Sequence, residues 1–358
     1  MFNELAKLIP TMEVIFIAEK EKRRDWNIDY NNINFHFTLL FKGSIDSINS
    51  YTITKYTWKK LEEIRPETII ICDYSNIFGW VALLWAKKYN INLIFWLDST
   101  YNDRKHFFPK EQIKHLFLKH FDAFLTPGER TKQYLEFMKV DSSKIVKTGY
   151  GVNNDHFIRQ YRQHYDNKEN LLKDLKIQKE SNFIFIGRFA PEKNILTLLN
   201  SFLEVSKSNS EWGLILLGDG PLINEINTFI SKNNLQDKIQ LPGFIQHDKI
   251  VEYLIASDVF ILPSFSEPWG LVVNEGMLCS MPVIVSNRCG CAPELVKEGI
   301  NGFSFDPNNE YRLTNLMQGF MNGNYNIKSM GKASFATIGN HSPKLVAQKI
   351  INGIKTYL

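Results

Sequence analysis

One stretch, residues 257–279 (SDVFILPSFSEPWGLVVNEGMLC), constrains the fold of this 358-residue chain more than any other. The apolar run at residues 259–262 predicts a buried strand, which ends at Pro263 because proline cannot donate to a strand ladder. A short polar loop follows, and the apolar spacing of residues 270–279 predicts a helix. In open α/β sheets, ligands bind at the loops that follow the strands. We therefore expect a largely parallel sheet with a ligand site at this loop.

Two carboxylates flank the start of the predicted helix. Glu267 precedes the helix, and Glu275 lies within it eight positions later. The free N–H groups of a helix N-terminus favour an anion. An anion cradle with an acid on either side suits a ligand with a phosphate in its middle and hydroxyls at both ends. A nucleotide sugar has this form.

Residues 267–275 (EPWGLVVNE) resemble the acid-x7-acid motif of the retaining glycosyltransferases of family 4, the glycosyl transferases group 1. The resemblance implies the GT-B fold, an α/β architecture of two Rossmann-like, doubly wound parallel-sheet domains that face each other across a cleft. It also implies that Glu275 accepts bonds from the ribose hydroxyls and that Glu267 holds the donor sugar. Backbone N–H groups near Gly270 and Leu271 would hold the distal phosphate.

A second loop, residues 187–194 (GRFAPEKN), follows a predicted strand at residues 183–186. Basic side chains in a loop are often only surface charge. However, the Arg188 guanidinium can donate to two phosphate oxygens at once, and Lys193 adds a compact positive charge. The loop resembles the family's G-R-x-x-x-E-K motif, beginning at Gly187, whose Arg and Lys bind the diphosphate and stabilise the leaving nucleotide. Two motifs in one predicted sheet favour the binding interpretation.

Two further residues each allow two interpretations. Phe244 follows a predicted strand where relatives hold the nucleobase, so it could stack on the base or pack between domains. Asp98 follows the strand predicted at residues 93–97, where many relatives carry a histidine. It could orient an acceptor hydroxyl or accept its proton, or it could simply cap a turn.

The predicted organisation has three segments. Residues 1–165 form a Rossmann-like acceptor domain, residues 166–342 form the nucleotide-sugar donor domain, and residues 343–358 form a helix that crosses back to the first domain. Strands are expected at residues 14–17, 35–41, 69–72, 93–97 and 123–126 of the first domain, with helices at residues 77–89 and 111–120.

The family's first strand has no counterpart in the sequence. Residues 4–8 resemble the family's first helix and residues 12–18 its second strand. A first strand lies in the middle of a doubly wound sheet, so its loss leaves a gap in the core. Either the true start lies upstream, or residues 14–17 take the central place and the topology is rearranged.

Residues 105–121 (KHFFPKEQIKHLFLKHF) alternate basic and bulky apolar side chains. They predict either a peripheral contact with a membrane, which would bring the enzyme to a lipid-linked acceptor, or aromatic packing on the sheet beneath a basic surface. The chain contains no apolar run long enough to span a bilayer and no signal peptide pattern. We expect it in the cytoplasm, with or without contact at the inner face of the membrane.

Composition excludes other classes of function. The small excess of basic residues in the N-terminal half is too weak for a nucleic-acid partner. The four cysteines show no zinc spacing, and a Gly-x-Gly-x-x-Gly turn for a nicotinamide cofactor is absent. Without an Asp-x-Asp tripeptide, we expect no metal and no cofactor.

The predicted function is sugar transfer with retention from a nucleoside diphosphate to an acceptor hydroxyl, on a sugar or a lipid-linked acceptor. Bacterial polysaccharide, lipopolysaccharide or glycolipid synthesis would be the setting. The alternative is a catalytically inactive GT-B protein that binds nucleotide or serves as a scaffold.

Overall fold

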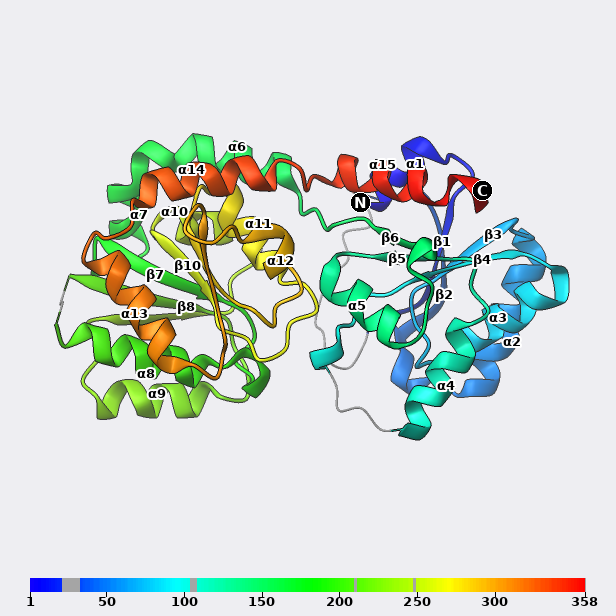
Figure 1. Ribbon diagram of the computed structural model, residues 1–358, viewed down its shortest axis with the longest axis horizontal. Helices are drawn as coiled ribbons and strands as arrows, with labels where there is room; N and C mark the ends of the chain where they lie inside the picture. The colour runs from blue at the N-terminus through cyan, green and yellow to red at the C-terminus, as the bar shows by residue number, and fades with distance from the viewer. Residues whose placement is uncertain (21–32, 104–107, 209–210, 247–248, 358) are drawn as a thin grey trace.

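The computed structural model describes residues 1–20, 33–103, 108–208, 211–246 and 249–357. Two α/β halves lie side by side along the long axis, with the C-terminal half at the left of Figure 1 and the N-terminal half at the right. Every pair of neighbouring strands is parallel. The α/β class predicted from the alternation of apolar strands and helices is confirmed.

The C-terminal half contains one six-stranded sheet. Its strands are β7 (Ser181–Ile186), β8 (Trp212–Leu217), β9 (Ile239–Gly243), β10 (Val259–Leu262), β11 (Val283–Ser286) and β12 (Gly302–Phe305). The spatial order is β12-β11-β10-β7-β8-β9, so the chain moves outward from β7 and then returns to start again at β10. This reversal makes the sheet doubly wound, and its switch point lies between β7 and β10.

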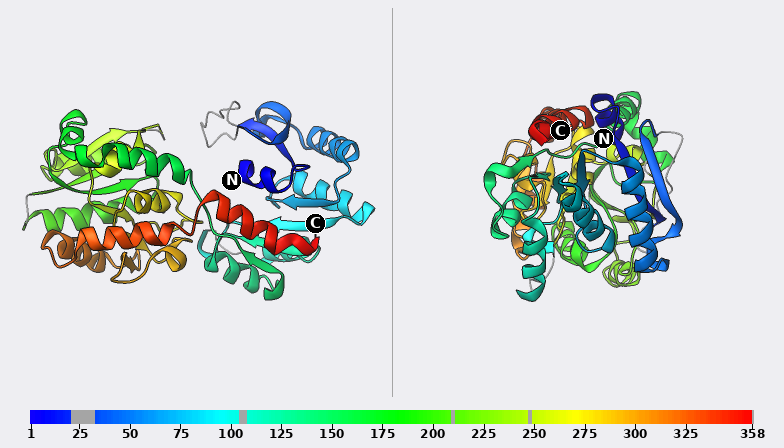
Figure 2. Two further views of the ribbon diagram at one scale, coloured as in Figure 1. Left: turned by 90° about the horizontal axis from the view of Figure 1, so that it is seen from above. Right: turned by 90° about the vertical axis from the view of Figure 1, so that its right-hand side faces the viewer.

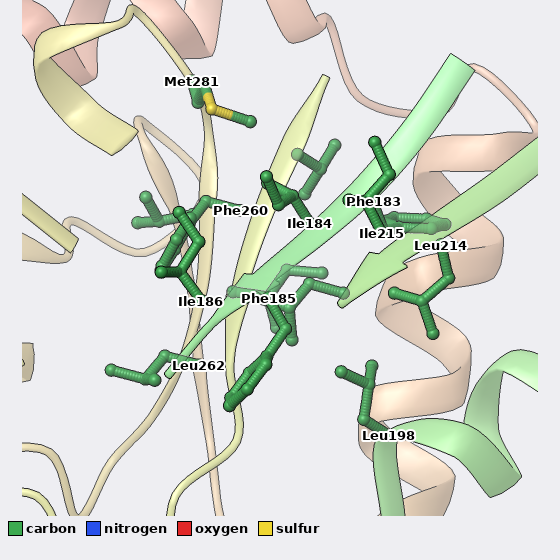
Figure 3. Close-up of a cluster of buried hydrophobic side chains, with 14 of the residues drawn as sticks. Phe183, Ile184, Phe185, Ile186, Leu198, Leu214, Ile215, Phe260, Leu262 and Met281 are labelled. Carbon is green, nitrogen blue, oxygen red and sulfur yellow. The ribbon is translucent and has the colours of Figure 1, made fainter. Parts of the chain in front are cut away.

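Helices cover both faces of this sheet (Figure 1). They are α8 (Ile195–Ser206), α9 (Ile223–Lys232), α10 (Ile250–Ile255), α11 (Leu271–Leu278), α12 (Ala292–Leu295), α13 (Glu310–Met321) and α14 (Ile327–Ile338). Because both faces are covered, the strands are mostly apolar. Phe183, Ile184 and Phe185 of β7 are fully buried although successive side chains point to opposite faces (Figure 3).

The N-terminal half contains a four-stranded sheet in the order β3-β4-β5-β6. Its strands are β3 (Thr68–Ile71), β4 (Asn92–Trp96), β5 (Ala123–Thr126) and β6 (Ile145–Lys147), and its helices are α2 (Ser50–Ile64), α3 (Ile77–Tyr89), α4 (Phe108–Leu118) and α5 (Glu129–Phe137).

Across both halves, short 3-10 helices lie at Ile45–Ser47, Tyr101–Asp103, Ser142–Lys144, Tyr165–Asn167, Pro191–Lys193 and Lys355–Tyr357. None of the described helices is long and apolar enough to cross a membrane.

The first two strands stand apart from this sheet. β1 (Glu13–Lys20) and β2 (His36–Ser44) pair only with each other among the described residues. β1 is half-buried over most of its length, whereas a central strand would be buried. These two strands are therefore separate from the four-stranded sheet, and the missing first strand stays a prediction. The rearranged alternative, in which residues 14–17 take the central place, is wrong because β1 makes no ladder with β3 or β4.

The last helix, α15 (Pro343–Ile354), crosses to the N-terminal half as expected (Figures 1 and 2). It packs beside α1 (Phe2–Leu8) and covers β4 and β5, where its Val346, Ala347, Ile350 and Ile354 join Ile94, Trp96 and Leu125 in one buried cluster. The hydroxyl of Thr68 donates to the Tyr357 carbonyl over 2.6 Å. The C-terminal segment therefore completes the core of the first half.

The chain passes between the halves twice, and the two passages touch. A Cβ at Gly151 would lie 2.6 Å from the backbone nitrogen of Pro343, and one at Gly149 would lie 3.0 Å from the His341 ring. Glycine is therefore required for this close approach. Helix α6 (Asn154–His164) comes next and is followed by α7 (Lys168–Asp174), and Phe157 of α6 lies in the core of the C-terminal half. We propose that the boundary falls before α6 rather than at residue 165.

We predict that Ile350→Ala destabilises the protein. The fully buried side chain joins the last helix to the first sheet, so the cavity should lower the free energy of unfolding by about 2–5 kcal/mol. Urea unfolding followed by tryptophan fluorescence measures this as a shift of the midpoint. Lys349→Ala, an exposed neighbour on the same helix, is the control and should change little. Equal midpoints for the two variants would contradict this account of the crossing.

Candidate active site

The two motif loops leave the same edge of the sheet from neighbouring strands. Val259 and Phe260 of β10 pair with Phe183 and Ile184 of β7. The loop after β7 and the loop after β10 therefore begin side by side at the switch point. The backbone N–H of Phe265 donates to the Glu192 carbonyl over 2.9 Å, which fastens one loop to the other.

An ion pair joins the motifs directly. The Lys193 ammonium donates to the Glu267 carboxylate, and the two side chains are only 18% and 14% exposed. A paired lysine and carboxylate tolerate this burial because each offsets the other's lost hydration. The structure thus brings together two of the three residues predicted to be catalytic, while the side chain of Arg188, the third, is exposed at the end of β7.

A glycine turn supports the loop that carries Arg188. Gly218 has a φ of +143°, and a Cβ there would lie 1.9 Å from the Gly187 carbonyl oxygen. The N–H of Gly187 donates to Leu217, and the N–H of Gly218 donates to Gly243, over 3.0 and 2.9 Å. The loops after β7, β8 and β9 therefore converge on one point, beside which Phe244 stands 67% exposed. This exposure is incompatible with Phe244 packing between the halves. Base stacking stays a prediction.

Helix α11 begins at Gly270, whose φ is +99°. A Cβ at this position would lie 2.9 Å from the Leu262 side chain, so only glycine gives this turn at low cost. The side chain of Leu271 is 42% exposed, whereas Glu275 is 6% exposed on the inner side of the helix. Burial, followed by the Glu275 charge, raises the pKa of the Cys279 thiol well above its usual value, so this thiol stays protonated.

A tryptophan in the acidic motif connects it to the N-terminal half. Trp269 is 3% exposed and packs edge-on against Tyr150, with ring centroids 5.7 Å apart. Its indole N–H donates to Asn274 Oδ1 over 2.9 Å, and the Asn274 amide donates to the Tyr150 carbonyl over 2.9 Å. Sequence reasoning missed this connection, because nothing in the motif itself shows that its central residues contact residue 150.

Asp98 lies just after β4, beside the same tyrosine. The surrounding protein raises the pKa of the Asp98 carboxyl, and a hydrogen bond with the Tyr150 hydroxyl partly opposes the shift. Burial, followed by the Asp98 charge, raises the pKa of Tyr150 well above its usual value, so this hydroxyl remains a donor. Asp98 is therefore held next to the crossing of the two halves. Its role on the acceptor side stays a prediction.

Three further contacts join the halves. The Arg130 guanidinium donates to the Asn287 carbonyl, and the Glu129 N–H donates to the Glu294 carboxylate over 2.5 Å. The Ser266 hydroxyl donates to Asp103 over 2.9 Å. Burial raises the pKa of Glu294, and the bond from the Glu129 N–H opposes this shift. The N-terminus of α5 therefore lies directly against the loops of the C-terminal half.

The segment predicted to meet a membrane is described in part. Residues 105–107 lie outside the described residues, and residues 108–118 form α4. Phe117 and Leu118 are buried in the N-terminal core, as the packing interpretation expects, but Ile113 and Leu116 are 55% and 48% exposed. The Lys114 ammonium donates to the Glu111 carboxylate over 2.7 Å and to the Tyr134 hydroxyl over 2.9 Å. Both interpretations therefore account for part of the helix.

The described residues contain no cluster of three or more His, Cys, Asp or Glu side chains that could hold a metal ion. All four cysteines are free thiols, and Cys279, Cys289 and Cys291 are buried. That the chemistry proceeds without metal or cofactor stays a prediction.

Comparison with known proteins identifies the family. The family model of the Glycosyl transferases group 1 matches residues 167–336, which span both motif loops. Residues 167–336 therefore form a domain of the glycosyl transferases group 1. A glycosyltransferase of Methanocaldococcus jannaschii is 26% identical over 91% of this chain and 85% of its own length. The alpha-monoglucosyldiacylglycerol synthase of Acholeplasma laidlawii is 26% identical over 83% of this chain and 78% of its own length.

Solved structures of glycosyltransferases share the whole fold. A glycosyltransferase from Rickettsia africae superposes with a TM-score of 0.77 at 20% identity, covering 99% of this chain and 93% of its own. Anabaena HepE in complex with UDP gives a TM-score of 0.78 at 15% identity, covering 96% of this chain and 100% of its own. The predicted GT-B architecture is thereby confirmed.

The stability of this glycosyltransferase should depend on His341, which lies at the second passage between the halves. Burial, followed by the Lys349 charge, lowers the pKa of His341 to about 4, so the ring is neutral in the folded protein. The unfolded chain binds a proton near the ordinary pKa of about 6.5. Stability should therefore fall as the pH drops from about 6.5 towards 4, and His341→Asn should remove roughly 1–2 kcal/mol of that fall.

Urea midpoints of the wild type and His341→Asn, compared between pH 7 and pH 4.5, measure this effect. His36→Asn, an exposed histidine on β2, is the control and should keep the wild-type pH dependence. Identical pH dependence for all three proteins would mean that His341 is not buried in its neutral form.

Proposed function

We propose that this protein is a retaining glycosyltransferase that moves a sugar from a nucleoside diphosphate to an acceptor hydroxyl. Polysaccharide, lipopolysaccharide or glycolipid synthesis is the proposed setting. The observation that carries the proposal is the Lys193–Glu267 pair at the switch point, with Arg188 exposed beside it and Glu275 buried on α11. Open α/β sheets bind nucleotides at such a crevice. The Anabaena relative, whose fold is the same, was solved with UDP and with UDP-glucose.

Under this proposal the ion pair separates when the donor binds. The ammonium of Lys193 turns to the diphosphate and the carboxylate of Glu267 turns to hydroxyls of the donor sugar. Arg188 can fork two phosphate oxygens and offset the charge that develops on the departing nucleotide. Until the donor arrives, the pair keeps both side chains in place and compensates their charges.

The rest of the donor occupies the groups around this pair. Glu275 accepts bonds from the ribose hydroxyls, since an ionised carboxylate is an acceptor only. The N–H groups at Gly270 and Leu271 hold the distal phosphate, and Phe244 stacks on the base. We name no nucleophile. The leaving phosphate accepts the proton of the acceptor hydroxyl, and Asp98 orients that hydroxyl.

A lipid-linked acceptor is favoured by two observations. Two relatives, from Acholeplasma laidlawii and Streptococcus pneumoniae, are named alpha-monoglucosyldiacylglycerol synthases. On α4 of this chain, Ile113 and Leu116 are exposed beside Lys110 and Lys119, which are also exposed. Exposed apolar side chains flanked by lysines fit the boundary of an anionic bilayer.

Nucleotide binding is the first test of the donor site. We expect the unfolding midpoint to rise by about 2–4 °C with one of UDP, GDP, ADP or dTDP in hundredfold excess over its dissociation constant. Glu275→Gln and Arg188→Gln should lose this rise because each removes a ligand contact, while Arg159→Gln, an exposed arginine on α6, should keep it. If no nucleotide raises the wild-type midpoint, the donor proposal fails.

A sugar-transfer assay distinguishes an active enzyme from an inactive GT-B scaffold. The preferred nucleotide, supplied as its sugar conjugate with diacylglycerol in mixed micelles, should give a product that keeps the donor's anomeric configuration in the NMR spectrum. EDTA should leave the rate unchanged if no metal takes part. A protein that binds the nucleotide and transfers sugar to no acceptor would instead support the scaffold alternative.

Membrane contact through α4 is tested with vesicles. The double variant Ile113→Ser with Leu116→Ser should bind vesicles of phosphatidylglycerol roughly tenfold more weakly than wild type, because two apolar side chains no longer enter the bilayer. Ile300→Ser, which changes an isoleucine 58% exposed in the other half, is the matched control. Sedimentation with vesicles measures binding. Equal loss in the control, or no loss in the double variant, contradicts a docking role for α4.

A further inference from the structure

A cavity of about 290 Å³ lies in the N-terminal half beside the motif loops. Residues from two elements line it: Thr100, Tyr101 and Asn102 after β4, and Arg130 and Gln133 on α5. Its size is close to the lower end of small-molecule sites, about 300 Å³. Donor binding and catalysis as proposed above make no use of these five residues.

Two residues that line the cavity each have a buried polar atom without a hydrogen-bond partner among the described residues. These atoms are the hydroxyl oxygen of Thr100 and Nε of Arg130. The Thr100 residue is only 2% exposed. Buried polar atoms in folded proteins almost always have partners, because an unmade hydrogen bond costs free energy. The Arg130 Nε–H can only donate and the Thr100 hydroxyl can donate, so one acceptor group would complete both.

The charge of Arg130 is also uncompensated. Among the described residues no carboxylate lies within 4.0 Å of its guanidinium nitrogens, and its Nη2 donates to a backbone carbonyl, that of Asn287. The acids nearest in sequence are already used. Asp103 accepts from the Thr100 N–H and the Ser266 hydroxyl, and Glu129 pairs with Lys147 over 2.9 Å. A guanidinium in this position favours an anion.

The cavity wall is connected to the loop that carries Glu267. Arg130 bonds to Asn287, and three residues further on the Gly290 N–H donates to the Glu267 carbonyl over 2.9 Å. Burial raises the pKa of the Cys289 thiol, and the charges of Glu267, Lys193, Arg130 and Asp103 all act on that same thiol. The cavity therefore lies beside the place proposed for the donor sugar, on the acceptor side.

We propose that this cavity binds a phosphoryl group carried by the acceptor. Residues that carry donor groups line it from two elements: Thr100 and Asn102 after β4, and Arg130 and Gln133 on α5. Donors from several directions suit the tetrahedral oxygens of a phosphate. That the phosphoryl group belongs to the acceptor substrate rests on the proposed function. The phosphate site itself rests on the cavity alone.

Binding of two phosphate sources tests the proposal. Glycerol 3-phosphate should raise the unfolding midpoint of the wild type if the acceptor is a free phosphate ester. Vesicles of phosphatidic acid should bind more tightly than phosphatidylcholine vesicles with diacylglycerol if the phosphate belongs to a lipid. Arg130→Gln should weaken the binding that is seen at least tenfold, and Thr100→Val should weaken it severalfold. Lys132→Gln removes one positive charge from the same helix outside the cavity and should leave it unchanged.

Two results would overturn the proposal: no binding of either phosphate source to the wild type, or equal weakening in Arg130→Gln and Lys132→Gln. The second result would mean that only the general positive charge of α5 acts. UDP measured in the same assay keeps the two proposals apart. If UDP raises the unfolding midpoint but no phosphate source binds, the phosphate site is overturned and the donor site still holds. If a phosphate source binds but UDP does not raise the midpoint, the phosphate site still holds and binding of UDP at the donor site is overturned.

Discussion

The pairing of β10 with β7 is the contact on which the site depends. The two strands lie 76 positions apart in their register, Val259 against Phe183, yet they are neighbours because the chain returns to the middle of the sheet at this point. Their loops consequently emerge together, and Lys193 forms an ion pair with Glu267. The fully buried aromatic and branched side chains of β7 and β10 hold this pairing in place (Figure 3). The hydrophobic core thus sets the distance between opposite charges.

The elements of this sheet could be predicted because their signals are local. β10 was expected at residues 259–262 and α3 at residues 77–89, and both have these bounds. Helix α2 was missed, since its first turns, SYTITKYT, are rich in β-branched residues that usually favour strands. Tertiary packing of Ile53 and Leu61 decided in favour of the helix there.

The arrangement of the site was less accessible from sequence. Family resemblance assigned Arg188, Lys193, Glu267 and Glu275 to one donor site, and the structure puts Lys193 against Glu267. The contacts of Trp269 with Tyr150 and of Arg130 with Asn287 join residues more than a hundred positions apart, and no local pattern marks them. The separate β1–β2 unit could not be predicted either, because a strand's pattern does not specify its partner.

The crossing of α15 has a consequence for synthesis on the ribosome. N-terminal domains usually fold first as the chain emerges. Here Val346, Ile350 and Ile354 belong to the same buried cluster as Ile94, Trp96 and Leu125, so the earliest half cannot close its core until nearly the last residues have been made. During translation the apolar face of β4 and β5 that α15 covers stays exposed to solvent until the C-terminal half has been synthesised. This exposed apolar face is a binding site for chaperones, although the strands of the N-terminal half have already been synthesised.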